Sequence, residues 1–178
     1  MISDNKLNLG SGLLFMNGYV NFDYASHGGF APDVKGRIED LLEHFEENRF
    51  EEIIMVHVFE HFHYTDCIKI LKDCLFLLKP CGKLIIEGPC ILGVYQHYWV
   101  EDKDATALVD QIFAREDYRL KYGNEYAHKW GWTGETVGRE MENVGFSTAT
   151  VAKCTACGGD GGKIHLRPFR DFRVEGTK

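Results

Sequence analysis

The sequence predicts an α/β fold built on one mostly parallel, seven-stranded sheet. Short apolar runs alternate along the chain with stretches of helical periodicity, which is the pattern of strands joined by crossover helices. Residues 52–56 form an apolar, β-branched run typical of a strand buried on both faces of a parallel sheet. Near the end of the sequence, two strand-like runs flank the glycine-rich residues 158–162, which predicts an antiparallel pair at the sheet edge.

The individual helices and strands are predicted from local sequence patterns. Helical periodicity predicts helices over residues 66–78, 104–118 and 133–144. Lys79-Pro80 ends the first helix, because the residue before a proline is pushed out of the helical region. Gly145 stands where a left-handed cap ends the third helix. Seven runs are expected to be strands: residues 6–9, 19–23, 34–38, 52–56, 82–87, 146–153 and 164–175.

Length and composition restrict the class of protein. The 178 residues suit one domain, 1–178, and 44% hydrophobic residues argue against disorder. A net charge of −7 argues against broad attraction to nucleic acid or to an anionic membrane, and no apolar run approaches the ~20 residues of a membrane span. The first ten residues hold no apolar signal core, and the six scattered cysteines suit a reducing compartment, so we expect a cytoplasmic location.

The first predicted strand runs straight into Gly10-Ser11-Gly12. Two glycines at this place let a ligand approach backbone amides at the carboxyl end of the strand. Asp23, which ends the second predicted strand, can accept hydrogen bonds from two ribose hydroxyls, although a solvated strand-end carboxylate fits equally well. A nicotinamide or nucleotide-sugar enzyme is disfavoured, because Phe15 replaces the third fingerprint glycine and only 11 residues, not about 20, separate Gly12 from Asp23.

Three blocks, in a fixed order, resemble the class I S-adenosylmethionine-dependent methyltransferases. They are residues 6–23 (KLNLGSG, then GYVNFD), 52–62 (EIIMVHVFEHF) and 77–89 (LLKPCGKLIIEGP), and the likeness resumes over residues 128–146. It is nearest to the small members found among sugar and cell-surface polysaccharide genes. The resemblance implies a Rossmann-like fold, S-adenosylmethionine as cofactor, and methyl transfer to an oxygen of a sugar or a related small molecule.

The resemblance also implies where the cofactor binds. Asp23 would hold the ribose, Asp40 would lie beside the adenine ring with Leu41 as an apolar wall, and His57 would lie under the cofactor and face the acceptor. The implied cofactor-binding residues are Asn8, Gly10, Ser11, Gly12, Asp23, Asp40, Leu41 and His57.

Three positions depart from the family pattern. Leu14 replaces the last glycine of the common GxGxG form, and Cys81 stands where a Lys-Pro-Gly-Gly turn has a glycine. The link from Gly10 to Gly18 has only nine residues, whereas a parallel crossover normally needs a dozen or more. We therefore expect a first helix of about one turn and a cofactor pocket that is more open on that side.

An aromatic-rich segment, residues 90–132, is expected to form a small cap on the acceptor side. Polar-tipped rings beside a cleft suit stacking against a sugar, although a simple core of the cap explains the same composition. The tryptophans, tyrosines and histidines of this segment are Tyr95, His97, Tyr98, Trp99, Tyr118, Tyr122, Tyr126, His128, Trp130 and Trp132.

A hydroxyl acceptor needs a general base, and imidazole titrates near neutral pH. His57 is the first candidate for this catalytic role and His128 the second, followed by His61 and His97. For His61, holding its own loop in place is the favoured role.

No metal site is expected. Cys154-x-x-Cys157 has no second ligand pair, and His61-x-His63 has no matching carboxylate to complete a facial set. A rival to the enzyme hypothesis is a binding or scaffolding module that keeps the fold without turnover, which the short first link favours. The expected partner is a small-molecule acceptor, and a homodimer is compatible with the sequence.

Overall fold

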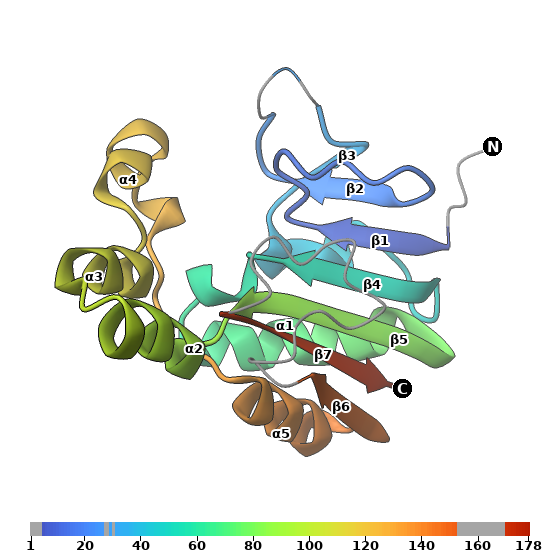
Figure 1. Ribbon diagram of the computed structural model, residues 1–178. Coiled ribbons are helices and arrows are strands. Elements are labelled where there is room, and N and C mark those ends of the chain that lie inside the picture. Colours follow the sequence, from blue (N-terminus) through green and yellow to red (C-terminus); the bar gives the residue numbers. More distant parts are fainter. Residues whose placement is uncertain (1–4, 27–28, 30, 153–169) are drawn as a thin grey trace.

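A computed structural model of the chain describes residues 5–26, 29, 31–152 and 170–178. Its strands are β1 (Lys6–Leu9), β2 (Val20–Asp23), β3 (Val34–Lys35), β4 (Phe50–Val56), β5 (Leu78–Pro89), β6 (Thr148–Ala152) and β7 (Asp171–Thr177). They form one seven-stranded sheet in the order β3-β2-β1-β4-β5-β7-β6 (Figure 1). Strand β7 pairs antiparallel with both β5 and β6, whereas all the other pairs are parallel, and this confirms the predicted sheet.

Two of the predicted helices form as expected. Helix α1 (Tyr64–Leu77) ends just before Lys79-Pro80. Helix α5 (Gly134–Val144) starts at Thr133, whose hydroxyl accepts a hydrogen bond from the Thr136 amide, and ends at Gly145 with φ of 116°. Both helices pack in one layer with the 3₁₀ segment η1 (Ile38–Glu43).

The segment expected as one helix over residues 104–118 is instead two helices, α3 (Ala105–Phe113) and α4 (Glu116–Tyr122). Ala114 breaks the helix, because its φ of 65° lies outside the right-handed region. Together with α2 (Ile91–Tyr95), the π-helical turn η3 (Gln96–Glu101) and the 3₁₀ turn η4 (Asn124–Tyr126), these helices make up most of residues 90–132. They project beyond the carboxyl ends of β1, β4 and β5 (Figure 1).

Burial of β4 on both faces explains its uninterrupted apolar run. Ile53 and Met55 belong to the main core between the sheet and the α1 layer, whereas Ile54 and Val56 join a smaller cluster on the opposite face. Successive strand residues point to opposite faces, so a strand covered on both sides needs apolar residues throughout.

The link between β1 and β2 contains turns and no helix, so the expected single helical turn is wrong. Asn8 stabilises this link in place of a helix. Its buried amide nitrogen donates to the carbonyl of Leu14 at 2.7 Å and to Oδ1 of Asn21 at 2.9 Å. The short link is thereby held against the ends of both strands.

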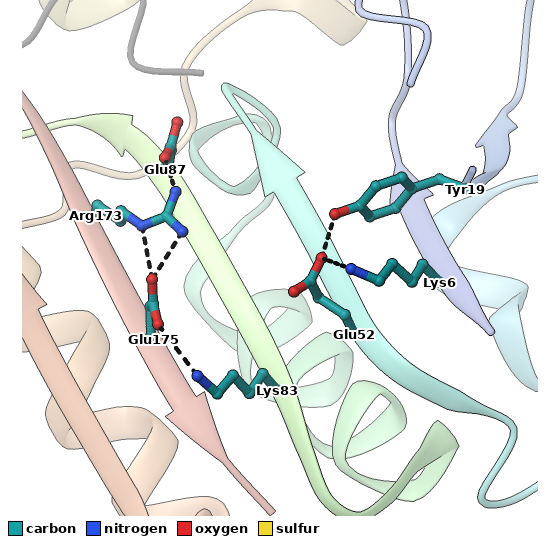
Figure 2. Close-up of polar contacts among 7 residues, drawn as sticks. All are labelled: Lys6, Tyr19, Glu52, Lys83, Glu87, Arg173 and Glu175. Carbon is teal, nitrogen blue, oxygen red and sulfur yellow. Dashed lines mark hydrogen bonds and ion pairs between the residues drawn. The ribbon is translucent and has the colours of Figure 1, made fainter. Parts of the chain in front are cut away.

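Charged side chains lie on the face of the sheet opposite α1 (Figure 2). Arg173 of β7 pairs across the strands with the buried Glu87 of β5, and it also contacts Glu175 at 2.7 Å. Glu52 of β4 accepts hydrogen bonds from Lys6 and Tyr19. A buried carboxylate beside a guanidinium is stable only as a pair, so the Glu87–Arg173 contact fixes the register of β5 and β7.

The remaining predictions fall partly outside the described residues. The features that lie outside them are Cys154, Cys157, the glycine-rich residues 158–162 and the first part of the strand expected over 164–175. Among the residues that the structure does describe, every helix is too short or too polar to cross a bilayer.

Candidate functional site

A cavity of about 300 Å³ lies at the carboxyl ends of the parallel strands. We call it the glycine-loop cavity, because the loop after β1 forms one of its walls. The ends of β2 and β4, the segment after β3, the residues around His61 and the turn at Tyr126 contribute the rest of its lining. Five of the residues expected to bind a cofactor line it, namely Gly10, Ser11, Gly12, Asp23 and His57.

The glycine loop turns sharply back toward β2. The amides of Gly10 and Ser11 both donate to the carbonyl of Phe22, at 2.9 and 3.1 Å. Gly10 has a φ of +66°, and a Cβ there would lie 2.5 Å from Cγ2 of Val58. Only glycine satisfies both conditions, which explains why this residue stands at the end of β1.

Asp23 presents its carboxylate to the same loop. Its Oδ2 accepts a hydrogen bond of 2.8 Å from the Gly12 amide, and its Oδ1 accepts one of 3.1 Å from the Ala25 amide. A carboxylate offers about four lone-pair sites, so it can hold the loop and accept ligand hydroxyls at the same time. The acid at the end of β2 is therefore both a structural anchor and part of the cavity wall.

Three of the expected cofactor-binding residues do not line the cavity. Asn8 is buried beneath the loop, Leu41 packs in the core, and Asp40 is exposed. Ile38 and Glu39 line the cavity in their place. Ile38 and Leu41 both pack in the core, whereas Glu39 lies at the cavity wall and Asp40, where the backbone departs from helical angles, is exposed.

A second cavity of about 300 Å³ adjoins the first, and we call it the histidine cavity. Residues of α3 and of the chain between α4 and α5 form its outer side. His57, His61 and Tyr126 line both cavities and so form a shared wall. Of the aromatic and histidine residues predicted for the cap, Tyr126 and His128 line the histidine cavity.

The tryptophans of the cap lie elsewhere. Trp132 is buried, with its ring centroid 5.1 Å from that of Phe59, and it contacts Tyr64. Trp99 and Trp130 are substantially exposed. The tryptophans therefore serve the core and the surface and not the wall of either cavity.

His57 is held between two carboxylates. Its Nε2 lies 2.8 Å from Oδ2 of Asp171, at the start of β7, and its Nδ1 lies 3.3 Å from Oε1 of Glu60. Burial alone would lower the pKa of His57, but the contacts with Asp171 and Glu60 raise it to about 9. Because both ring nitrogens face carboxylates, His57 has no lone pair directed at a ligand, and this geometry does not suit the general-base role that the sequence suggests.

Glu60 belongs to the short 3₁₀ turn η2 (Phe59–His61) and is almost completely buried. Burial alone would raise the pKa of Glu60, but the contact with the protonated His57 lowers it to about 2. The group is therefore an ionised carboxylate at the base of the histidine cavity.

His61 and His128 face each other, with ring centroids 5.1 Å apart. The Nδ1 of His61 lies 3.2 Å from the carbonyl of Ala127, and that of His128 lies 2.9 Å from the carbonyl of Gln111. A carbonyl only accepts, so each Nδ1 carries the proton and each Nε2 keeps a lone pair. Burial also lowers the pKa of His128, which favours its neutral form.

Sequence reasoning missed the partners that complete this site. Asp171 lies 114 residues after His57, and no local pattern links them. Glu60 was visible as the acid of the FEH run, but its burial next to His128 depends on the hydrogen bond of 2.8 Å from the Lys129 amide to the Glu60 carbonyl.

Solved structures with a similar fold include several methyltransferases. An S-adenosylmethionine-dependent methyltransferase from Archaeoglobus fulgidus matches with a TM-score of 0.61 and 14% identity, over 98% of this chain and 86% of its own. Another, from Mesorhizobium loti, matches with a TM-score of 0.61 and 14% identity, over 98% of this chain and 90% of its own. The chain has the Rossmann-like methyltransferase fold.

A third match has a partner protein. It comes from a Haloferax volcanii complex with the Trm112 methyltransferase activator, with a TM-score of 0.57, 14% identity, and coverage of 98% of this chain and 82% of the matched chain. No family model and no curated protein sequence matches the chain. At such low identity, the structural likeness establishes the fold and leaves the activity to be argued from the site.

Proposed function

We propose that the protein is an S-adenosylmethionine-dependent methyltransferase that acts on a small polar acceptor. The cofactor would bind in the glycine-loop cavity, and the acceptor would bind in the histidine cavity. The observation that carries this proposal is the Asp23 carboxylate, fixed by the Gly12 amide in the cavity at the carboxyl ends of β1 and β2. In an open α/β sheet, ligands bind at this edge.

The residues of the glycine-loop cavity fit a nucleoside without a pyrophosphate. Asp23 can accept from both ribose hydroxyls, and Ile38 and Val58 supply apolar surface for a flat base. Glu39, paired with Arg37 at 3.2 Å, adds a carboxylate at the same wall. The loop has no third glycine for close approach of a pyrophosphate, which supports S-adenosylmethionine over a dinucleotide.

The shared wall favours direct transfer between the two cavities. S-adenosylmethionine supplies a methyl group on a sulfonium sulfur, which leaves as a neutral thioether in an in-line displacement. The main task of the protein is to hold the acceptor atom against that methyl group, because correct positioning alone supplies several kcal/mol. His57, His61 and Tyr126 lie where the two ligands would meet.

We assign the two proposed catalytic histidines to different tasks. His57, with both nitrogens directed at carboxylates, forms a charged, fixed part of the wall. His128 presents an Nε2 lone pair, because its Nδ1 is committed to the carbonyl of Gln111. Such a lone pair can take a proton from an acceptor hydroxyl or bind a cation.

The lining of the histidine cavity supports a sugar or a related polyol as acceptor. Asp110, Gln111 and Arg115 offer both donors and acceptors of hydrogen bonds, and Tyr126 offers an aromatic ring. Polar groups around one aromatic surface are what a sugar ring requires. In this arrangement, residues 90–132 act as the cap over the acceptor. The free thiols of the described cysteines support a cytoplasmic location.

The test has two stages. Titration calorimetry with S-adenosylmethionine and with S-adenosylhomocysteine should show one binding site, and absence of heat at millimolar ligand in a folded sample would refute the proposal. Mass spectrometry should then detect a gain of one methyl group on a member of a panel of free and nucleotide-linked sugars. Cofactor binding without transfer to any acceptor would favour the binding module that keeps the fold without turnover.

A further inference from the structure

Three potential metal ligands meet at the histidine cavity. Glu60, His61 and His128 each offer one ligand atom, and these three atoms all lie within 4.8 Å of one another. We propose that Glu60, His61 and His128 bind a divalent metal ion that positions the acceptor. Two imidazoles and one carboxylate on one side of an ion form a facial set that leaves the other coordination positions open.

The hydrogen bonds of the two histidines favour this role. In metal sites, a ligating imidazole usually donates its other N–H to a carbonyl or a carboxylate, which fixes the ring and its tautomer. His61 and His128 do this through Nδ1, toward the carbonyls of Ala127 and Gln111. Both Nε2 lone pairs are therefore prepared for an ion before it binds.

The burial of the Glu60 carboxylate is an independent reason to expect a bound cation. The Glu60 side chain is only 4% exposed, and Oε2 has no hydrogen-bond partner among the described residues. Burial of an ionised carboxylate is costly unless opposite charge compensates it. His57 approaches Oε1 at 3.3 Å, which leaves Oε2 for a second positive charge. A cation at this point would complete the compensation.

A backbone hydrogen bond brings His128 close to Glu60 and His61. Glu60 and His61 are adjacent in η2, whereas His128 follows 67 residues after His61. The Lys129 amide donates to the Glu60 carbonyl at 2.8 Å, which holds the two chain segments side by side. The sequence analysis expected no metal site because it considered the nearby His63 as the partner of His61, whereas His63 is exposed and His128 lies beside His61.

The ligand types predict which metals bind. Two imidazole nitrogens favour Zn²⁺, Co²⁺, Mn²⁺ or Fe²⁺ over Mg²⁺ and Ca²⁺, which prefer oxygen ligands. The cavity of about 300 Å³ beside the three ligands leaves room for an acceptor oxygen to complete the coordination. Three protein ligands and an open position are typical of a catalytic site, whereas structural sites are closed.

The chemical role of the ion rests on the proposed function. An acceptor hydroxyl bound to the ion becomes more acidic and loses its proton to water in the cavity. The resulting oxygen then bonds to the methyl carbon, while the electron pair of the carbon–sulfur bond stays on the sulfur. His128 then serves as a metal ligand, and His57 needs no free lone pair.

Metal binding is tested first without any acceptor. The chelator-stripped full chain is titrated with Zn²⁺ and with Mn²⁺ by calorimetry, and with Co²⁺ by visible absorption. We expect one ion per chain and a Co²⁺ spectrum of nitrogen and oxygen ligation. Failure of all three ions to bind at millimolar concentration would overturn the proposal.

Matched variants then locate the site. His61→Asn and His128→Asn should each weaken metal binding at least about tenfold, whereas His63→Asn, two residues away, should leave it unchanged. Glu60→Gln should weaken metal binding as His61→Asn and His128→Asn do. Circular dichroism verifies that each variant is folded. Equal affinity in His61→Asn, His128→Asn and the unaltered chain would refute the site, as would an equal loss in His63→Asn.

Binding of S-adenosylhomocysteine, measured on the chelator-stripped chain, separates the two proposals. Heat from this ligand without metal binding refutes the metal site and supports the proposed function. Metal binding without heat from this ligand supports the metal site and refutes the proposed function.

Discussion

The amide of Gly12 donates a hydrogen bond of 2.8 Å to Oδ2 of Asp23. This contact joins the tip of the loop after β1 to the last residue of β2, across a link that contains no helix. In a parallel crossover of ordinary length, a helix would hold these two strand ends in position. Here a single carboxylate shapes the cavity and remains at its wall.

Asp23→Ala should weaken binding of S-adenosylhomocysteine at least about tenfold, because it removes the carboxylate that we expect to bind the ribose and also releases the loop. Asp40→Ala should change the affinity less than twofold, because Asp40 does not line the cavity. Calorimetry on both variants checks this. A loss in Asp40→Ala as large as that in Asp23→Ala would contradict this prediction and support the place beside the adenine ring that the resemblance implies for Asp40.

Gly10→Ala should lower the free energy of unfolding by about 1–3 kcal/mol, because it combines a strained φ with a clash. The added methyl group would lie 2.5 Å from Cγ2 of Val58. Urea unfolding measures the loss. The double variant Gly10→Ala/Val58→Ala should be less destabilised than the sum of the two single variants, because the clash disappears. Simple additivity would show that the clash contributes nothing.

Arg173→Met should destabilise the fold by about 3 kcal/mol, because it leaves the buried Glu87 without its guanidinium. Lys83→Met serves as the control on the same face of the sheet. Its 3.9 Å contact with Glu175 is exposed, so its removal should cost less than about 1 kcal/mol (Figure 2). Urea unfolding of both variants tests the difference, and equal losses would contradict it.

Cys81 should react with iodoacetamide at least about a hundredfold faster than Cys67 and Cys74. Cys81 is exposed, whereas burial raises the pKa of Cys67 to about 12 and that of Cys74 well above its ordinary value. The thiolate is the reactive form, so both buried thiols are protected at pH 8. Peptide mass spectrometry over time gives the three rates, and unfolding in urea should make them similar.

The sequence predicted the architecture well, because the decisive signals are local. The apolar run of β4, the proline after α1 and the glycine after α5 each depend on a few adjacent residues. The predicted helix over residues 104–118 was wrong, because its periodicity continues through Ala114 although the backbone does not. A pattern of side chains does not show where the backbone leaves the helical region.

The site could be predicted only in part. Gly10, Gly12 and Asp23 line the cavity as expected, since their place at strand ends follows from the sheet itself. The resemblance implied Asp40, whereas the adjacent acid Glu39 lines the cavity, and the sequence does not show which of two neighbouring acids faces it. The contact between His57 and Asp171 joins opposite ends of the chain, and local patterning carries no information about it.

The position of β7 affects the order in which the sheet can form. This strand lies between β5 and β6, although it follows both in the chain. Until residues 171–177 take their place, β5 and β6 have no common neighbour, and His57 lacks the carboxylate at 2.8 Å. Because the insertion of β7 joins segments far apart in the sequence, we expect it to be a late and slow step of folding that leaves two strand edges unpaired until it is complete.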